Sequence, residues 1–467
     1  MSANNGGNQG VGGALDLQEG PSLLTTRLSI MMFLQFAIWG AWAVLIAKHM
    51  SNLGFSGTQI NYVYLTTAVG AMLSPLIAGW IADRFMPNQV FTGIVHLLGA
   101  VFLFVAWKQT QFGAMWTVIF IYAVLYMPTI ALTNGIAFHH MKDSRKFGYI
   151  RVWGTIGWII INYLLSLYLG WWESRDPSIS HAGDCLPVAA VLSAIMGLYC
   201  FSLPNTPPSK EAKNPYAFLE ALKLASNRNF AVLLAISFVV AIELPFYYNL
   251  TILFMTDAVG GVGLAESQAT RAMLLGQVAE VLVMLLVASS LRHIGMRGTI
   301  FLGILAWPVR YAIFAIGQPT WLVVAAQSLH GICYAFFFVG GMIAVERLSH
   351  KDIRASAQGL IVFATNGVGM LIGSLLAGWV SDYFVDGAGT RAWAKIFMVP
   401  IIVTVLAAIV FVAMFNERKF QKDSARIEQE DTGAAPRCLE CGYNLTGNVS
   451  GVCPECGEPC ALETTAT

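Results

Sequence analysis

Long apolar runs separated by short polar stretches repeat along most of the chain. Twelve of them are long enough to cross about 30 Å of hydrocarbon as a helix. They lie near 28–48, 59–82, 89–107, 112–134, 150–171, 187–203, 229–256, 270–290, 298–316, 320–345, 355–384 and 393–415. A segment surrounded by lipid must satisfy its own backbone groups, so we expect each run to be an α-helix. The pattern predicts an all-α membrane protein with twelve transmembrane helices.

Composition agrees with this pattern and narrows the partners. The 467 residues are 56% hydrophobic and 11% charged, with a mean hydropathy of +0.63, whereas soluble chains carry roughly 25% charged residues. The formal net charge of +1 and the absence of a basic stripe with interleaved aromatics argue against nucleic acid as a partner. The lipid bilayer is the expected partner. Residues 1–27 contain no signal-peptide cleavage pattern, and we expect a flexible cytoplasmic N-terminus followed by a retained first span.

The Lys and Arg residues between the runs set the orientation. With both termini in the cytoplasm, the inner side receives most of them and the outer side few, as the positive-inside rule requires. The inner set is Arg84, Lys142, Arg145, Lys146, Lys210, Lys213, Lys223, Arg228, Arg292, Arg297, Arg347 and Lys351. The outer set is Lys48, Lys108, Arg175, Arg271, Arg391 and Lys395. We therefore expect a multi-pass membrane protein with both termini in the cytoplasm.

The longest inner loop, 204–228, divides the chain into two groups of six spans, at 28–203 and 229–416. The groups echo each other, because YIRVWGTIGW opens the fifth span at Arg151 and DIRASAQGLIVF opens the eleventh at Arg354. Parallel repeats of this kind place a central site between two six-helix bundles. A second echo, AGWIADRF at 78–85 and AGWVSDYF at 377–384, falls on opposite membrane sides, and chance is an open explanation.

Charged groups at bilayer depth are expensive and mark functional candidates. Glu243, Glu280 and Arg310 lie deepest in apolar sequence, and Gln277 shares a helix face with Glu280. One interpretation is an internal ion pair, with Arg310 neutralising a glutamate. The other interpretation is a ligand or proton site. We favour it for Glu280, and we give the two interpretations equal weight for Glu243 and Arg310.

A second set of candidates lies on the fifth span, where Arg151, Thr155 and Trp158 share one face. Position alone favours a snorkelling interfacial arginine at Arg151. His96 and His330 lie mid-span, where most histidines are satisfied by a neighbouring carbonyl or hydroxyl, and we give that interpretation more weight for His96. Pro245 is expected to break or bend the seventh helix.

The tail carries a metal-binding pattern. Cys438, Cys441, Cys453 and Cys456 form two CxxC pairs. This spacing predicts a structural, four-thiolate zinc ribbon within 438–460 of a cytoplasmic tail, 417–467. Cytoplasmic thiols are kept reduced, which argues against disulfides there.

Several segments together carry a family resemblance. LSIMMFLQFAIWGAW, YMPTIALTN, IRVWGTIGW, GQVAEVLVM, AWPVRYAIFAIG and IRASAQGLIVFATNGVG occur in family order, and residues 27–416 resemble the bacterial nucleoside permeases, the nucleoside:proton symporters of the major facilitator superfamily. GWIADRF resembles the superfamily signature in which the acidic residue latches the cytoplasmic gate, which assigns gating to Asp83 and Arg84. The resemblance implies the major facilitator fold, two six-helix bundles with the substrate between them.

The resemblance also implies roles for individual residues. Arg151, Thr155, Gln277 and Glu280 match positions that hold the nucleoside, and Trp158 and Tyr334 stand where the family has aromatics. The chain departs from the family at Pro245 and Tyr248, where polar residues are usual, with Asn249 one position late. It departs again at Ala335, where the family has an aspartate. Glu280 is then our candidate for the coupling proton.

The predicted function is import of nucleosides by alternating access, coupled to protons, by a secondary transporter. A different solute, such as a sugar or a modified nucleoside, stays open, as does a membrane sensor that docks a partner through the zinc ribbon. An enzyme is not expected, because the spans contain no nucleophile and base constellation.

Overall fold

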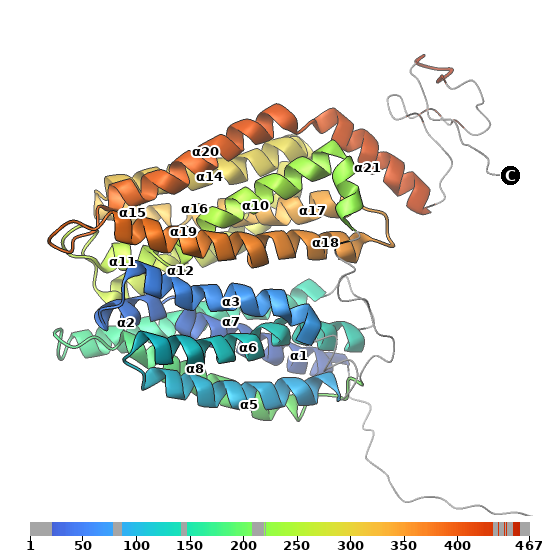
Figure 1. Cartoon of the computed structure of the whole chain (residues 1–467). Helices are drawn as coiled ribbons and strands as arrows, with labels where there is room; N and C mark the ends of the chain where they lie inside the picture. Colours follow the sequence, from blue (N-terminus) through green and yellow to red (C-terminus); the bar gives the residue numbers. More distant parts are fainter. Residues whose placement is uncertain are drawn as a thin grey trace, which may run out of the picture.

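The computed structural model describes residues 21–77, 86–141, 147–207 and 221–432, the single residue 219, and residues 438, 443, 445 and 452–457 of the tail. The regular elements within these residues are helices. Figure 1 shows them in two groups, with α1–α8 below and α10–α20 above. We call these groups the N-terminal and C-terminal bundles.

The N-terminal bundle contains the helices of the first six predicted spans. They are α1 (Pro21–Ala43), α2 (Ile46–Asn52), α3 (Gly57–Ile77), α5 (Asn88–Trp107), α6 (Phe112–His140), α7 (Phe147–Glu173), the short η3 (Ala182–Asp184) and α8 (Cys185–Cys200).

The C-terminal bundle is more interrupted. Its helices are η4 (Ala221–Ser226), α10 (Arg228–Tyr248), α11 (Thr251–Thr256), α12 (Glu266–Met284), α13 (Val287–His293), α14 (Gly295–Ile316), α15 (Thr320–Ala326), α16 (Leu329–Ile332), η5 (Cys333–Val339), α17 (Gly340–Arg347), α18 (Arg354–Val362), η6 (Phe363–Gly369), α19 (Met370–Tyr383) and α20 (Trp393–Met414). A further helix, α21 (Glu417–Thr432), follows. The segments η5 and η6 are single π-helical stretches inside the tenth and eleventh spans, and π-bulges of this kind are frequent at functional sites.

The predicted spans are found as helices. In the described part of the chain, ten helical stretches are long and apolar enough to cross a membrane, and the bent pair α12 and α13 would make eleven. The remaining predicted span is occupied by α3, whose 21 residues extend about 31 Å at 1.5 Å per residue. The all-helical membrane fold predicted from the apolar runs is confirmed.

Local sequence explains several helix ends. The side chain of Asn227 accepts hydrogen bonds from the backbone N–H groups of Asn229 and Phe230 and so caps the start of α10. Helix α14 ends where Gly317 adopts a left-handed conformation at φ 71° and donates its N–H to Ile313. Both ends lie where the polar loops of the sequence predict them.

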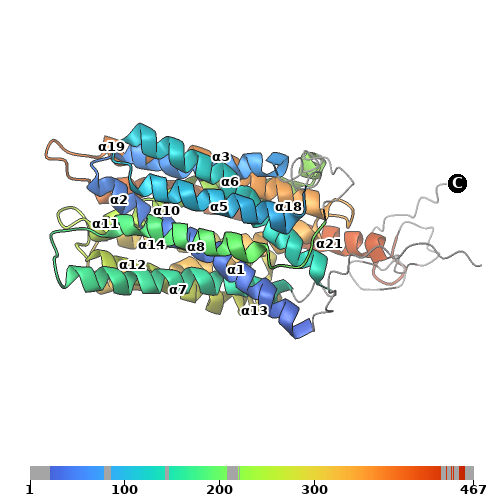
Figure 2. The same ribbon diagram turned by 90° about the horizontal axis from the view of Figure 1, so that it is seen from below.

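The two bundles meet along two pairs of helices. Helix α7 packs against α12, and α3 packs against α19, as both views show for α3 and α19 (Figures 1 and 2). Helices α2 and α11 lie at one end of the molecule, while α18 and α21 lie at the other (Figure 2). The Lys and Arg distribution predicts that the α2 end faces outward and the α21 end faces the cytoplasm, and we call the α2 end the outer end.

Inside the N-terminal bundle, His96 is fully satisfied. Its Nδ1 lies 3.3 Å from Oγ of Ser193, and its Nε2 lies 2.9 Å from Oε1 of Gln35. Gln35 donates in turn to Thr129 at 2.8 Å. These residues are buried, and each finds its hydrogen-bond partner among neutral side chains. The structural interpretation of His96 is confirmed.

Candidate functional site

Helix α7 presents the predicted face toward the centre of the molecule. Arg151, Thr155 and Trp158 are half-buried, whereas their neighbours Val152 and Trp153 are exposed on the outer face of the helix. A snorkelling arginine would share that outer exposure. Arg151 instead belongs to the inward face.

Aromatic rings surround this face. The guanidinium of Arg151 lies over the ring of Phe36, 3.8 Å from its centroid. Trp158 meets Trp39 edge to face at 5.9 Å, and Trp39 meets Tyr126 in the same way at 6.3 Å. The arrangement offers aromatic surface beside a fixed positive charge.

Helix α12 supplies the opposite face. Gln277 is half-buried, and Glu280 is 7% exposed. Helix α12 packs against α7, the helix that carries Arg151. The structure therefore brings together candidates from both bundles, a cation from one and a carboxylate from the other.

Close helix packing places Glu280 beside the tenth span. A Cβ on Gly331 of α16 would lie 2.5 Å from the carbonyl carbon and oxygen of Ala279, so only glycine lets the two helices approach this closely. As a result, Nε2 of His330 lies 3.7 Å from Oε2 of Glu280. His330 was not among the predicted site residues. The mid-span position was its one sequence signal.

Tyr334 lies one helical turn beyond His330, in the π-helical stretch η5, and is half-buried. The rings of Tyr334 and His330 are 6.1 Å apart. Tyr334 thus belongs to the same region as Glu280. The π-helical stretch that contains Tyr334 could not be predicted from the apolar run.

Arg310 does not form the direct ion pair with a glutamate that the sequence allowed. Its Nη1 lies 3.4 Å from Nδ1 of His330, and its guanidinium lies over the rings of Tyr247 and Trp307, at 3.8 and 4.4 Å. Glu243 instead accepts a hydrogen bond of 2.5 Å from the hydroxyl of Tyr311. Tyrosine and histidine partners stand where one interpretation of the sequence placed an ion pair.

Pro245 does not break its helix where it stands. Helix α10 continues through Pro245 to Tyr248, and α11 begins at Thr251 after a short turn. Asn249 still donates its N–H to the carbonyl of Pro245 at 3.0 Å. The hydrogen bonds after the proline are kept, so the break falls in the turn.

The outer end of the molecule contains contacts that sequence reasoning missed. Asp382, at the end of α19, accepts hydrogen bonds from the backbone N–H groups of Gly57 and Thr58 at 2.6 and 2.8 Å. Glu173, at the end of α7, accepts from the N–H and hydroxyl of Ser267 at 2.9 and 2.5 Å. Each carboxylate caps the first turn of a helix in the other bundle, where the helix dipole favours negative charge.

These two contacts, which we call the outer latches, are related by the repeat. Helix α7 is the fifth span and caps α12, the eighth. Helix α19 is the eleventh span and caps α3, the second. The side chain of Asn249 adds a buried hydrogen bond of 2.8 Å to Asn61 of α3. The bundles are therefore joined at the outer end. The predicted cytoplasmic gate, Asp83 and Arg84, lies outside the described residues.

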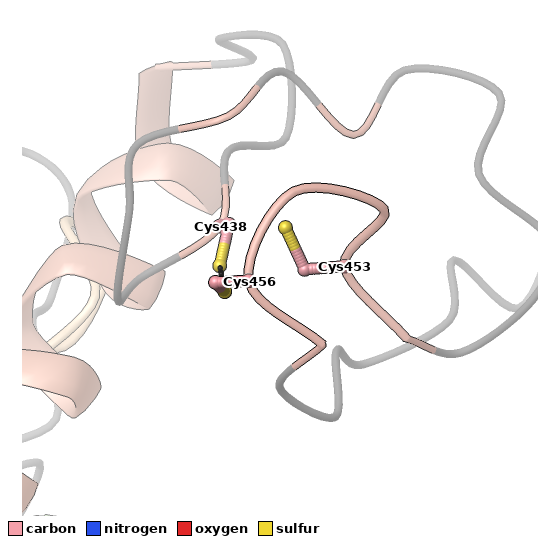
Figure 3. A group of neighbouring side chains, drawn as sticks. All are labelled: Cys438, Cys453 and Cys456. Carbon is pink, nitrogen blue, oxygen red and sulfur yellow. Dashed lines mark hydrogen bonds between the residues drawn. The ribbon is translucent and has the colours of Figure 1, made fainter.

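The tail brings three of the four predicted zinc ligands together. The sulfur atoms of Cys438, Cys453 and Cys456 all lie within 4.8 Å of one another, and Figure 3 shows the sulfur of Cys456 beside that of Cys438, with Cys453 on the facing turn. The Sγ atoms of Cys438 and Cys456 are 3.6 Å apart. Four thiolates at 2.3 Å around a tetrahedral zinc ion would be about 3.8 Å apart, so the described cysteines fit a metal ion. Cys441 lies outside the described residues.

Two helical bundles with facing polar groups at their contact, and latches at one end, define a secondary transporter of the major facilitator class. Comparison with known proteins identifies the family. The family model described as "Nucleoside H+ symporter" matches residues 23–420, and the chain belongs to this family. The transporter function predicted from the sequence is confirmed at that level.

Individual relatives agree. The chain is 33% identical to the putative nucleoside transporter YegT of Escherichia coli (strain K12), covering 87% of this chain and 97% of the relative. It is 31% identical to the nucleoside permease NupG of the same organism, covering 84% and 96%. A crystal structure of NupG matches with a TM-score of 0.75 at 30% identity, covering 84% of this chain and 99% of that one. The cysteine tail lies beyond the matched residues.

Proposed function

We propose that the protein imports nucleosides together with protons, and that the nucleoside binds between α7 and α12. The observation that carries this proposal is that α7 with Arg151 and α12 with Glu280, one helix from each bundle, pack against each other. A ligand between these two residues would contact both bundles, so its binding would be coupled to their relative movement. Thr155 and Gln277 supply neutral hydrogen-bonding groups for ribose hydroxyls and the edge of the base.

Aromatic side chains support the choice of a nucleoside. Trp158 and Tyr334 are both half-buried and lie on opposite bundles. A flat base gains favourable contact from stacking on such rings. The names of the relatives point the same way, since NupG is a nucleoside permease and a further relative, 29% identical, is a xanthosine permease.

The outer latches support alternating access. With Asp382 and Glu173 closing the outer end, the proposed site would communicate with the cytoplasm in this conformation. Breaking both latches would be needed before a nucleoside could enter from outside. The protein would work in the bacterial inner membrane, with both termini in the cytoplasm.

Uptake into proteoliposomes tests the substrate. We expect labelled uridine or adenosine to accumulate. Arg151→Ala should reduce uptake about 10-fold or more and Gln277→Ala about 3- to 10-fold, since a contact to a charged group is worth about 1.5 kcal/mol or more and a neutral one about 1 kcal/mol. Arg175→Ala is the matched control, because Arg175 also lies over an aromatic ring, Trp171 at 3.4 Å, but at the outer end. Equal uptake by all these variants would refute the proposed site.

A second candidate, another small solute, is favoured by the departures at Pro245, Tyr248 and Ala335. Competition separates the two. Unlabelled nucleosides should suppress uptake of labelled uridine, whereas maltose or other sugars should not. Suppression by a sugar alone would move the assignment to that solute.

We also propose that the tail binds one structural zinc ion through Cys438, Cys441, Cys453 and Cys456. Support comes from the three clustered sulfur atoms, and the two CxxC pairs supply the fourth ligand. The ion would stabilise the fold of the short tail. It would lie outside the transport path. Deleting residues 433–467, which follow α21 and spare the ion pair of Asp431 with Arg354, should therefore leave uptake intact, whereas a sensor would lose its output.

A further inference from the structure

His330 has different partners on its two ring nitrogens, and this asymmetry has chemical consequences. Its Nδ1 faces Nη1 of Arg310 at 3.4 Å, and its Nε2 faces Oε2 of Glu280 at 3.7 Å. An arginine can only donate hydrogen bonds. Nδ1 of His330 must therefore accept, which puts the proton of the neutral ring on Nε2, pointing at Glu280.

Arg310 is held in place as the hydrogen-bond donor to His330. Its side chain is fully buried and lies between the rings of Tyr247 and Trp307, and guanidinium groups stay charged in proteins. A second proton on His330 would have to break the bond from Arg310 and sit beside that charge. His330 is consequently held as a neutral donor rather than as a proton carrier.

His96 offers an internal comparison, because it is equally buried but has no charged partner. Both of its nitrogens face neutral groups, Ser193 and Gln35, and the hydroxyl can donate or accept. The accepting Oε1 of Gln35 places the proton of His96 on Nε2, so a neutral group rather than a cation fixes it. The arrangement at His330 is thus specific to the side that faces the proposed substrate site.

We propose that His330, oriented by Arg310, is a positioning residue for Glu280. The ring directs its Nε2–H at the ionised carboxylate, 3.7 Å away, and stabilises the negative charge there. The coupling proton then resides on Glu280, and its arrival or departure makes or releases the contact with His330. This inference rests on the proposed function of Glu280 and adds the residues that set its proton affinity.

Other groups also face this pair, and each enters the pH dependence. Glu280 interacts electrostatically with groups on α7, α10 and η5, and His330 touches aromatic rings on α10, α14 and η5 as well as Arg310. The groups are Arg151, Tyr247, Tyr248, Trp307 and Tyr334. Arg151 and Arg310 are the cations among them. The test must therefore change His330 while leaving both arginines in place.

Carbodiimide modification of Glu280 provides a measurement that needs no substrate. The reagent reacts with the protonated carboxyl group, and mass spectrometry locates the modified residue in the purified full-length protein. We expect His330→Phe to move the midpoint of the modification profile upward, by up to about one pH unit, since the variant lacks the N–H that favours the charged form of Glu280. In proteoliposomes, the pH at which proton-driven uptake is half-maximal should move by a similar amount.

His330→Gln is the conservative rescue. Its amide offers an oxygen to Arg310 and an N–H to Glu280, so the wild-type midpoint should return. His96→Gln is the matched control and should leave the midpoint unchanged. If His330→Phe does not give folded protein, His330→Met also lacks the donor and adapts to irregular space, and the same upward shift is expected of it.

An unchanged midpoint in the donor-free variant would overturn the inference, as would a shift in His330→Gln equal to that in His330→Phe. Failure of the proposed function would look different. The wild-type protein would then take up no nucleoside, while the modification profile of Glu280 would still respond to His330.

Discussion

The outer latches give a prediction about conformational balance. Asp382→Asn and Glu173→Gln keep the shape of each side chain but remove its charge. Each carboxylate accepts two hydrogen bonds at the first turn of a helix in the other bundle. The neutral variants should favour the outward-open state.

The size of the effect follows from these contacts. An amide oxygen can replace one of the two accepted bonds, so each variant loses one hydrogen bond and the attraction of a charge to a helix N-terminus. Together these terms are about 1.5 kcal/mol, which is roughly a 10-fold shift of the equilibrium per latch. The double variant should shift the equilibrium by about 100-fold if the two latches act independently.

Spin labels at the outer ends of α3 and α19 measure the balance directly. Electron paramagnetic resonance should show a long-distance population that is minor in the wild type, larger in each single variant and dominant in the double variant. Asp176→Asn is the control, because Asp176 lies in an outer loop and accepts hydrogen bonds only locally, from Ser178, which lower the pKa of its carboxyl group. A double variant with the wild-type distance distribution would refute this reasoning.

Two further predictions concern packing and the tail. Gly331→Ala should separate α12 from α16, because its Cβ would clash with Ala279, and should lower both the melting temperature and uptake; Gly113→Ala, where an added Cβ meets nothing within 4 Å, should change neither. Cys453→Ser or treatment with a strong chelator should reduce bound zinc from about one ion per chain toward zero, measured by elemental analysis, with uptake unchanged; a zinc content equal to that of the wild type would exclude the proposed ligand.

Much of the fold could be predicted because the membrane imposes one rule on every span. An apolar run must be helical, so α7 and α12 were expected from composition alone. Gln277 and Glu280 were expected on one face because helical periodicity fixes that relation. The satisfied state of His96 followed from the ordinary behaviour of a buried histidine.

Features that depend on contact between distant segments could not be predicted in this way. The bond from Arg310 to His330 joins two helices whose approach depends on side-chain packing. The echo at 377–384 contained Asp382. Its role as a cap could not be predicted, because the helix that it caps, α3, begins more than 300 positions away in the chain. Arg354, the repeat partner of Arg151, turned out to pair with Asp431 of α21 at 3.0 Å, because the added cytoplasmic helix provides a carboxylate there.

The most direct test of the account is uptake of labelled uridine and adenosine into proteoliposomes, with and without an inward proton gradient, for the wild type and Glu280→Gln. We predict that the gradient raises wild-type uptake and that the variant loses this response, because its amide cannot take up the coupling proton. A gradient response in Glu280→Gln equal to that of the wild type would contradict the central claim that Glu280 carries the proton.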